Sequence, residues 1–418
     1  MRRPRGPLWH NPDFLLLWSA QSVSQVGSQV TNLALPLAAI LVLKASTFEV
    51  AALNVVDLLP WVLFSLPAGV WVDRLRRKPL LVAADWGRAA TLASIPVAYG
   101  MHALTLAQLF AVGFAAGTLT VMFDVSYQSY LPSIVQRGEL GDGNSKLEVS
   151  RSGAQVIGPG VAGALIGAIT APYAIAVDAV SFICSALLLG AIRRVEELPE
   201  TLAESRRRMR EEIAEGLRFV TRHPILGPMM AFVATSNFFG TVTNAVLLVF
   251  AVRTLHLRAA TIGLIFSLAS IGTLIGALTG TRIARRVGVG PAMIGLAAFS
   301  GSALFLVPLA RDGYAIPFIV AAEFVFSFCG VALNVNGISL VQTITPDRLL
   351  GRANASRRLV VWGVMPFAGL IGGALGSSFG LRTALWVGAI GCALAFLPLL
   401  ASPLRHVNAI EDALALAD

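Results

Sequence analysis

The sequence has few charged residues for its length. Asp, Glu, Lys and Arg make up 13% of its 418 residues, where an ordinary soluble domain has roughly a quarter. Hydrophobic residues make up 56%, and the mean hydropathy is +0.74. A soluble core cannot bury so large an apolar fraction, so the composition excludes an ordinary soluble globular protein. It predicts that lipid surrounds much of the chain.

The residues and motifs that mark common enzymes are also scarce. The chain has only five His and lacks the H-E-x-x-H and phosphate-loop motifs. The acidic residues of its apolar segments lie far apart in the sequence. Its three cysteines, Cys184, Cys329 and Cys392, lie inside apolar stretches without the spacing of a disulfide or a metal site. The sequence therefore predicts no enzyme, no metal site and no cofactor.

Apolar segments recur along the whole chain, and a helix needs roughly 20 such residues to cross a bilayer. Before the midpoint, the pattern predicts spans at 14–43, 48–71, 79–100, 104–127, 149–170 and 172–192. After a charged stretch, it predicts spans at 225–252, 260–281, 290–310, 315–341, 356–380 and 383–402. The expected fold is an all-α membrane protein with twelve transmembrane helices in two pseudo-symmetric six-helix bundles.

The distribution of Lys and Arg predicts how the chain crosses the membrane. With a cytoplasmic N-terminus, 27 basic residues fall on the inside, and five fall outside: Lys44, Arg253, Arg258, Arg311 and Arg382. Because inside loops are enriched in basic residues, we expect both termini in the cytoplasm of a bacterial cell and the protein in its inner membrane. The net charge of +9 is spread over short loops, so we expect no nucleic-acid partner.

The charged stretch at the midpoint divides the chain into parts. It is rich in both signs of charge and in helix formers after Pro199, which indicates one or two amphipathic helices at the inner membrane face. We expect an N-terminal six-helix bundle over 1–192, a cytoplasmic linker over 193–224, a C-terminal six-helix bundle over 225–402 and a cytoplasmic tail over 403–418.

Two runs of residues repeat at half the chain length. When the sequence is compared with itself after a shift of 210 residues, seven residues from Leu140 to Leu165 align with identical residues. After a shift of 212 residues, five residues from Ser24 to Leu35 do so. The second run pairs Asn32 with Asn244. Parallel repeats of this kind place a substrate site near the bilayer midplane between two bundles, with access alternating from one side to the other.

The loop after the second span contains the segment GVWVDRLRRKPLL, which begins at Gly69. The segment resembles the signature of the major facilitator superfamily in the same loop, although Arg76 stands where the family usually has Gly. The resemblance implies close helix packing at the glycine and a conformational lock at the cytoplasmic mouth. The residues that this motif would use here are Gly69, Asp73, Arg74, Arg77 and Lys78.

A second motif lies in the fifth span, where GAQVIGPGVAGALIG is similar to the Gly-Pro motif of the antiporter branch of the superfamily. Gly158, Pro159 and Gly163 would form a smooth, bent face, but packing by small residues explains the glycines equally well. The fourth span lacks the Arg that many proton-coupled members have there. The strings FDVSYQSYLPSIV, VDAVSFICSALLL and PDRLLGRANASRR look like the subgroup of bacterial siderophore exporters and macrolide-type efflux proteins, which implies export of a small organic molecule.

Three acids within the predicted spans, Asp57, Asp178 and Glu323, are candidates for proton coupling, because acids in lipid are costly and mark function by default. Asp57 leads because desolvation near the midplane disfavours its charged form, and Glu323 lies in the outer half of its span. The alternative is that Asp57 only bonds a neighbouring helix. Asp85 and Arg88, three residues apart, are expected to neutralise one another as a structural pair.

Neutral polar residues supply hydrogen-bonding capacity along the spans, and each is equally a candidate for bonding between helices. The substrate-pathway candidates are Gln25, Gln29, Asn32, Asn54, Asn237, Asn244, Asn334, Asn336 and Trp362. The set suits an amphipathic molecule of the drug or siderophore class. The expected function is therefore proton-coupled efflux of such a molecule by a monomer. A passive facilitator, an uptake carrier, a receptor or scaffold and a membrane enzyme remain as alternatives.

Overall fold

A computed structural model describes residues 7–72, 75–194, 209–409 and 412, and no strand occurs among them. The chain divides into two compact units. Unit 1 comprises residues 1–45, 53–202 and 258–267, and unit 2 comprises residues 46–52, 203–257 and 268–418. The division exchanges two short stretches, so each unit takes in the start of a helix whose remainder belongs to the other unit.

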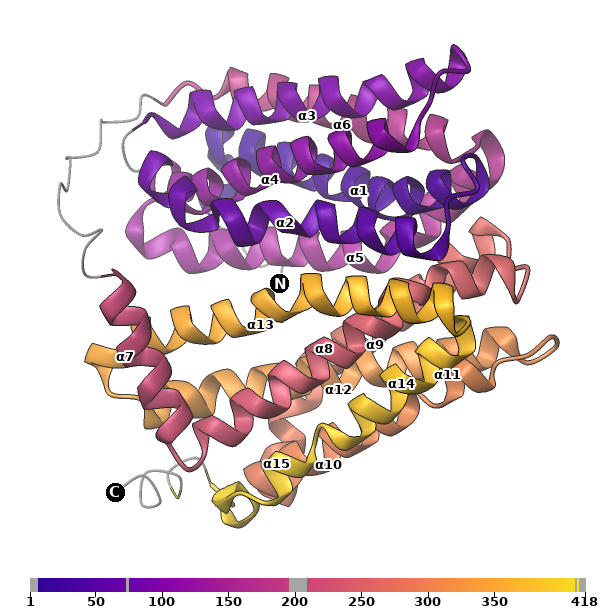
Figure 1. Ribbon diagram of the computed structural model, residues 1–418. Helices are drawn as coiled ribbons and strands as arrows, with labels where there is room; N and C mark the ends of the chain where they lie inside the picture. The colour runs from indigo at the N-terminus through magenta and orange to yellow at the C-terminus, as the bar shows by residue number, and fades with distance from the viewer. Residues whose placement is uncertain (1–6, 73–74, 195–208, 410–411, 413–418) are drawn as a thin grey trace, which may run out of the picture. The chain divides into compact units, whose positions relative to one another are not determined.

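Six long helices make up most of unit 1 and run side by side (Figure 1). They are α1 (Pro12–Leu41), α2 (Thr47–Val72), α3 (Arg77–Gly100), α4 (Leu106–Ile134), α5 (Leu140–Ile169) and α6 (Ala171–Ala191). Single turns, η1 (Pro7–His10) and η2 (Arg137–Glu139), precede α1 and α5. Asn11 caps α1 by accepting from the backbone N–H groups of Asp13 and Phe14, with Pro12 as the first helical residue.

The first helix that lies wholly in unit 2 is α7, which belongs to the predicted linker and is amphipathic. Its helices are α7 (Met209–Arg222), α8 (Leu226–Arg253), α9 (Ala259–Val287), α10 (Val289–Ala303), α11 (Leu306–Leu309), α12 (Ala315–Ile344), α13 (Asp347–Ser378), α14 (Leu381–Leu394) and α15 (Leu397–Leu400), followed by η3 (Pro403–His406). Two predicted spans are interrupted near a proline. Pro308 and Pro398 have no N–H to donate to the carbonyls of Leu304 and Leu394, so α10 and α14 end before them.

Within the described part of the chain, ten helices are long and apolar enough to cross a membrane, with α10–α11 and α14–α15 each forming one span. The helices α1 and α3 match them in length, at 30 and 24 residues, but carry more polar side chains. Each of the twelve predicted spans therefore corresponds to a long helical segment, and the all-α transmembrane prediction is confirmed.

A glycine repeated between the two halves of the sequence makes the same kind of close contact in each unit. In unit 1, a Cβ on Gly163 would lie 2.5 Å from the carbonyl oxygen of Ala259. In unit 2, a Cβ on Gly373 would lie 2.5 Å from the Cβ of Ala51. A side chain at either glycine would therefore collide with the neighbouring helix, so only glycine allows these helices to pack so closely. The 210-residue repeat thus preserves a packing contact as well as a sequence.

Candidate functional site

A cavity of about 960 Å³ lies within unit 2. Its walls come from α7, α8, α10, α12 and α13, so the helices of one bundle build it together. Pockets for small organic molecules usually measure about 300–1,000 Å³. The cavity is therefore large enough to enclose a whole molecule of drug size.

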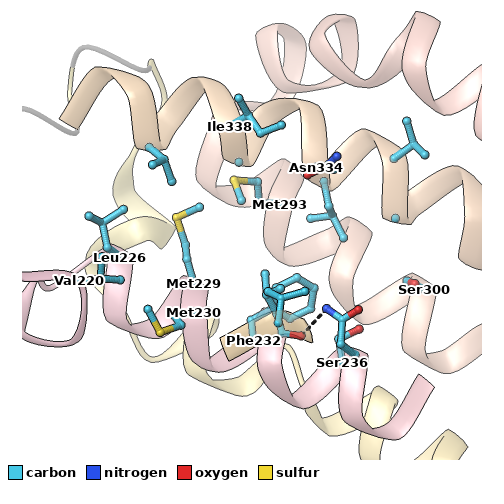
Figure 2. A pocket seen from close by; sticks show the side chains of 18 of the residues that line it. Val220, Leu226, Met229, Met230, Phe232, Ser236, Met293, Ser300, Asn334 and Ile338 are labelled. Carbon is cyan, nitrogen blue, oxygen red and sulfur yellow. Dashed lines mark hydrogen bonds between the residues drawn. The ribbon is translucent and has the colours of Figure 1, made fainter. Parts of the chain in front are cut away.

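One part of the cavity wall is apolar and adaptable. Met229 and Met230 of α8 and Met293 of α10 line it, and unbranched thioether side chains adjust to ligands of different shape. Gly337 of α12 leaves the space open, because a Cβ there would lie 3.6 Å from Cε of Met229 and 3.9 Å from Cε of Met293. Figure 2 shows Met229 and Met293 among the side chains that line the cavity.

Amides, hydroxyls and aromatic rings line the rest of the cavity. Asn334 and Gln342 extend from α12, and Trp362 comes from α13. Asn237 of α8 also lines it but donates to the carbonyl of Val233 at 2.8 Å, which uses part of its hydrogen-bonding capacity. No described side chain on the wall is charged. The wall therefore suits a molecule with a large apolar surface and a few polar groups.

Glu323 is aligned with this cavity along α12. The lining residues Phe326, Gly330, Asn334 and Gly337 recur every three or four positions and so share one helix face. Glu323 lies three residues before Phe326 on the same face and is half-buried. A carboxyl group thus stands one helical turn beyond the uncharged wall.

The two predicted asparagines of α12 have different roles. Asn334 is exposed and lines the cavity. Asn336 is buried, and its Nδ2 donates to the carbonyls of Gly280 on α9 at 3.1 Å and Ala332 at 2.8 Å. Asn336 therefore joins two helices and does not line this cavity. Asn244 of α8 is exposed but also lies outside the lining.

In unit 1, the polar candidates of α1 share a face, since Gln25, Gln29 and Asn32 are four and three residues apart. Gln29 packs against Gly158 of α5, where a Cβ would collide with it. Pro159 lies inside α5, and the next N–H, that of Gly160, donates to the Ser267 hydroxyl at 2.8 Å. The Gly-Pro segment is therefore a site of close packing within unit 1.

Asp57 and Asn54, one turn apart on α2, are both exposed, so unit 1 does not enclose the leading carboxyl candidate. Asp57 lies beside Gly117 of α4, where a Cβ would come within 2.8 Å of the Asp57 carbonyl oxygen. Because Gly117 has no side chain, α4 can pack closely against the backbone of α2 at Asp57.

The third acid, Asp178, is enclosed within unit 1. It is 1% exposed, and its two carboxylate oxygens accept from the hydroxyls of Thr31 and Ser181. The expected pair of Asp85 and Arg88 is also present on α3, as a buried ion pair. Unit 1 therefore buries charged groups that the cavity of unit 2 lacks.

The motif at the start of α3 lies partly within the structure. Asp73 and Arg74 fall outside the described residues, Gly69 belongs to the last turns of α2, and Arg77 begins α3. Lys78 donates to the carbonyls of Gly190 at 2.9 Å and Ile192 at 2.5 Å, at the end of α6. A cation at this position satisfies carbonyl groups that the helix leaves unpaired.

Comparisons with known proteins identify the family. A family model described as transmembrane secretion effector matches residues 4–416. The chain belongs to this family. It is thus a major facilitator transporter and not an enzyme.

Two relatives of this chain are bacterial transporters. The uncharacterized MFS-type transporter YfiS of Bacillus subtilis (strain 168) is 26% identical over 94% of this chain and 91% of its own. The multidrug efflux pump Tap of Mycolicibacterium fortuitum is 26% identical over 90% of this chain and 91% of its own. The likeness extends over nearly the full length of each protein.

Solved structures of other transporters share the fold of this chain. A bacterial homologue of the iron transporter ferroportin in the inward-facing state matches with a TM-score of 0.77 at 17% identity, over 93% of this chain and 98% of that one. The nucleoside transporter NupG, in a mutant form, matches with a TM-score of 0.76 at 13% identity, over 93% and 99%. At these identities the likeness concerns the fold alone.

Sequence reasoning missed the methionines that line the cavity. Met229 and Met230 lie in an apolar helix, where such residues are usually core, and Met293 lies 63 positions away. The spacing of Met229, Val233 and Asn237 along one face of α8 was an available signal. It shows one lining face, but the cavity depends on helices that are distant in sequence.

Proposed function

We propose that this transporter exports a small amphipathic organic molecule across the bacterial inner membrane in exchange for protons, by alternating access. The observation that carries the proposal is the cavity of unit 2, which combines an adaptable methionine wall, amide groups and no charged lining residue among those described. A wall of this kind favours apolar surface with a few polar groups over a highly charged metabolite. The multidrug efflux pump among the relatives supports the export direction.

Proton coupling is proposed from the acids of the membrane-spanning helices. Glu323 lies one turn beyond the cavity on its lining face, so its charge acts directly on a ligand there. The side chain of Asp57 is exposed and so can exchange protons with water. Either carboxyl, once neutralised, changes the local charge that a bound substrate experiences. Substrate and proton then favour different states of the carrier.

The test is transport in inverted vesicles across a panel of amphipathic compounds, with and without an imposed pH gradient. We expect gradient-driven uptake into the vesicles, loss of that uptake in Asp57→Asn or Glu323→Gln, and retained substrate binding and exchange. Asp142→Asn is the control, because it breaks only a surface pair with Lys146. Uptake that ignores the gradient would indicate a passive facilitator, and transport in the opposite direction would indicate an uptake carrier. A complete lack of transport and of binding across the panel would contradict this substrate class.

We also propose that both termini face the cytoplasm, because 27 basic residues then lie inside and five outside. Cysteines introduced singly at Lys44 and Arg311 should react with an impermeant thiol reagent in intact cells. A cysteine at Glu215 of α7 should react only after the cells are opened. The reverse labelling pattern would overturn this orientation.

A further inference from the structure

Two helices of unit 1 bury a group of polar and charged side chains between them. On α6, Asp178, Ser181, Phe182 and Ser185 recur every three or four residues and share a face. Asp85 and Arg88 of α3 face them, since the Arg88 guanidinium carbon lies 4.0 Å from the centre of the Phe182 ring. The same carbon lies 4.2 Å from the centre of the Phe123 ring of α4, so two aromatic faces hold the cation.

The group contains more negative than positive charge. Asp85, Arg88 and Asp178 are 0%, 4% and 1% exposed, so neither water nor bulk ions screen them. Arg88 is ion-paired with Asp85 and lies close enough to Asp178 to attract its charge as well. A single guanidinium can neutralise only one carboxylate, and an uncompensated charge in a dry interior is very costly. One of the two acids must therefore bind a proton.

The hydrogen bonds of Asp178 suit both of its protonation states. Its carboxylate oxygens accept from the hydroxyls of Thr31 on α1 and Ser181. A hydroxyl can also rotate and accept, so a protonated carboxyl group at Asp178 can donate to either of them. The site thus loses no hydrogen bond when a proton arrives or leaves.

Unsatisfied atoms in the same place show that the present pairing is not the only one available. Asp85 Oδ2, Arg88 Nε and Ser185 Oγ are buried and make no well-aligned hydrogen bond, although Ser185 lies close enough to act on the Asp85 carboxylate. Such atoms are rare in protein interiors, because each costs the free energy of an unmade hydrogen bond. Because these atoms lie close together, the Asp85 carboxylate and the Arg88 guanidinium can exchange hydrogen-bonding partners.

We propose that Asp85, Arg88 and Asp178 form one proton-binding site inside unit 1, in which Arg88 neutralises one carboxylate and the other carboxylate holds an exchangeable proton. While Arg88 pairs with Asp85, the proton is on Asp178. If Arg88 turns to Asp178, the proton passes to Asp85. A carboxyl group that loses its proton becomes a carboxylate, and no other bond changes. The role of this proton in coupling rests on the proposed function, whereas the sharing of the proton does not.

Few other charged groups lie around the site. On α4, Asp124 is half-buried and is attracted by both Arg88 and Arg151 of α5, so it links the site to the more exposed pair of Arg151 and Glu148. The only charged residue of α1 is Asp13, in its first turn. The charge balance at Asp178 therefore depends mainly on Asp85 and Arg88, with Asp124 as the next acidic group on α4.

The test is infrared difference spectroscopy of the purified full-length protein, which detects the C=O stretching band of a protonated carboxyl group. We expect Asp85→Asn and Asp178→Asn each to remove the same single band near neutral pH. In each variant, the remaining carboxylate becomes the only buried partner of Arg88 and stays ionised. Asp142→Asn, a surface substitution, should leave the band unchanged. Loss of the band in only one of the two variants would mean that the acids titrate independently, and would overturn the proposal.

A second variant covers the case in which a single substitution prevents folding. Asp85→Asn combined with Arg88→Gln leaves no buried cation, so Asp178 should keep its proton to a higher pH than in the wild type. An unchanged pH dependence of the band would contradict the shared site. Loss of the band on adding sodium at constant pH would also overturn it, in favour of a cation site. If the band behaves as expected while transport ignores the pH gradient, the coupling fails and the shared site stands.

Discussion

The interiors of the two units contain different kinds of polar group. The buried charged residues that the structure describes, Asp85, Arg88 and Asp178, all belong to unit 1. The described interior of unit 2 contains neutral groups such as Asn336 and Thr243, and its cavity has an uncharged wall. Unit 1 thus buries charged side chains, whereas unit 2 contains a cavity with an uncharged wall.

The proposed proton-coupled transport has two requirements, which this difference between the units would separate. A proton site needs a low dielectric and few competing charges, so that a single proton changes the energy markedly. A site for varied amphipathic molecules needs space and adaptable apolar walls. Charged groups in such a wall would need oppositely charged or hydrogen-bonding partners, which a varied set of apolar ligands does not supply. In the proposed function, the buried charged group of unit 1 meets the first requirement and the cavity of unit 2 meets the second, while Glu323 supplies a further carboxyl group beside the cavity.

The largest expected effect concerns the charged interior of unit 1. We expect Arg88→Leu to destabilise the protein by about 3–5 kcal/mol, because it leaves a buried carboxylate uncompensated. Adding Asp85→Leu should recover most of that loss, since the pair is then removed as a whole. Thermal unfolding in detergent measures both. Arg151→Leu is the control, because its pair with Glu148 is exposed and should contribute less than about 1 kcal/mol. Equal effects of Arg88→Leu and Arg151→Leu would remove the distinction between buried and surface charge.

The next effect concerns the space in unit 2. We expect Gly337→Leu to raise the concentration of substrate needed for half-maximal transport at least about tenfold, or ~1.4 kcal/mol, because the new side chain fills the region beside Met229 and Met293. Thermal unfolding should change little, since a Cβ at this position meets only flexible methionine ends. Gly276→Leu is the contrasting variant, because a Cβ there collides with the carbonyl of Phe328, and it should destabilise strongly. Unaltered transport by Gly337→Leu would show that the substrate does not use this cavity.

A smaller effect separates packing from transport within α12. Asn336→Leu should cost about 1 kcal/mol of stability, because it leaves the carbonyl of Gly280 without its donor. Asn334→Leu, two positions earlier, should leave stability unchanged and alter the transport of polar members of a compound panel. If the two substitutions have their effects interchanged, the assignment of the cavity face of α12 is wrong.

The smallest effect is a pH dependence at the start of α8. His223 accepts at Nδ1 from the backbone N–H groups of Ile225 at 3.1 Å and Leu226 at 3.3 Å, and burial lowers its pKa from the ordinary 6.5. The unfolded chain therefore binds a proton at His223 more readily than the folded chain does. The stability that neutral His223 contributes is complete above about pH 6.5 and is lost as the pH falls through the lower folded-state pKa. Melting temperatures between pH 5 and 8 measure the effect. His223→Asn should cap α8 without this pH dependence. His223→Ala should cost about 0.5–1 kcal/mol above about pH 6.5 and less as the pH falls. An acid sensitivity equal in His223→Asn and the wild type would assign it to another group.

The sequence predicted the helices more reliably than it predicted the site. Spans depend on local hydrophobicity, so their existence could be read from composition and periodicity. The Asp85 and Arg88 pair was also predictable, because three residues on a helix bring the two side chains together. Asn334 and Asn336 could not be told apart, since a hydrophobic helix gives no sign of which face meets a neighbouring helix and which meets a cavity.

By itself, the sequence determined that the chain is a bundle of membrane-spanning helices with a duplicated plan, because lipid requires long apolar helices with satisfied backbones. Only the tertiary structure decided that Asp178 lies within electrostatic reach of Arg88, 90 positions away, and that methionines from α8 and α10 approach Gly337 from two sides. The physical reason is the range of the forces. Hydrophobicity acts on each segment separately, whereas charge balance and cavity shape arise from side chains of several helices together.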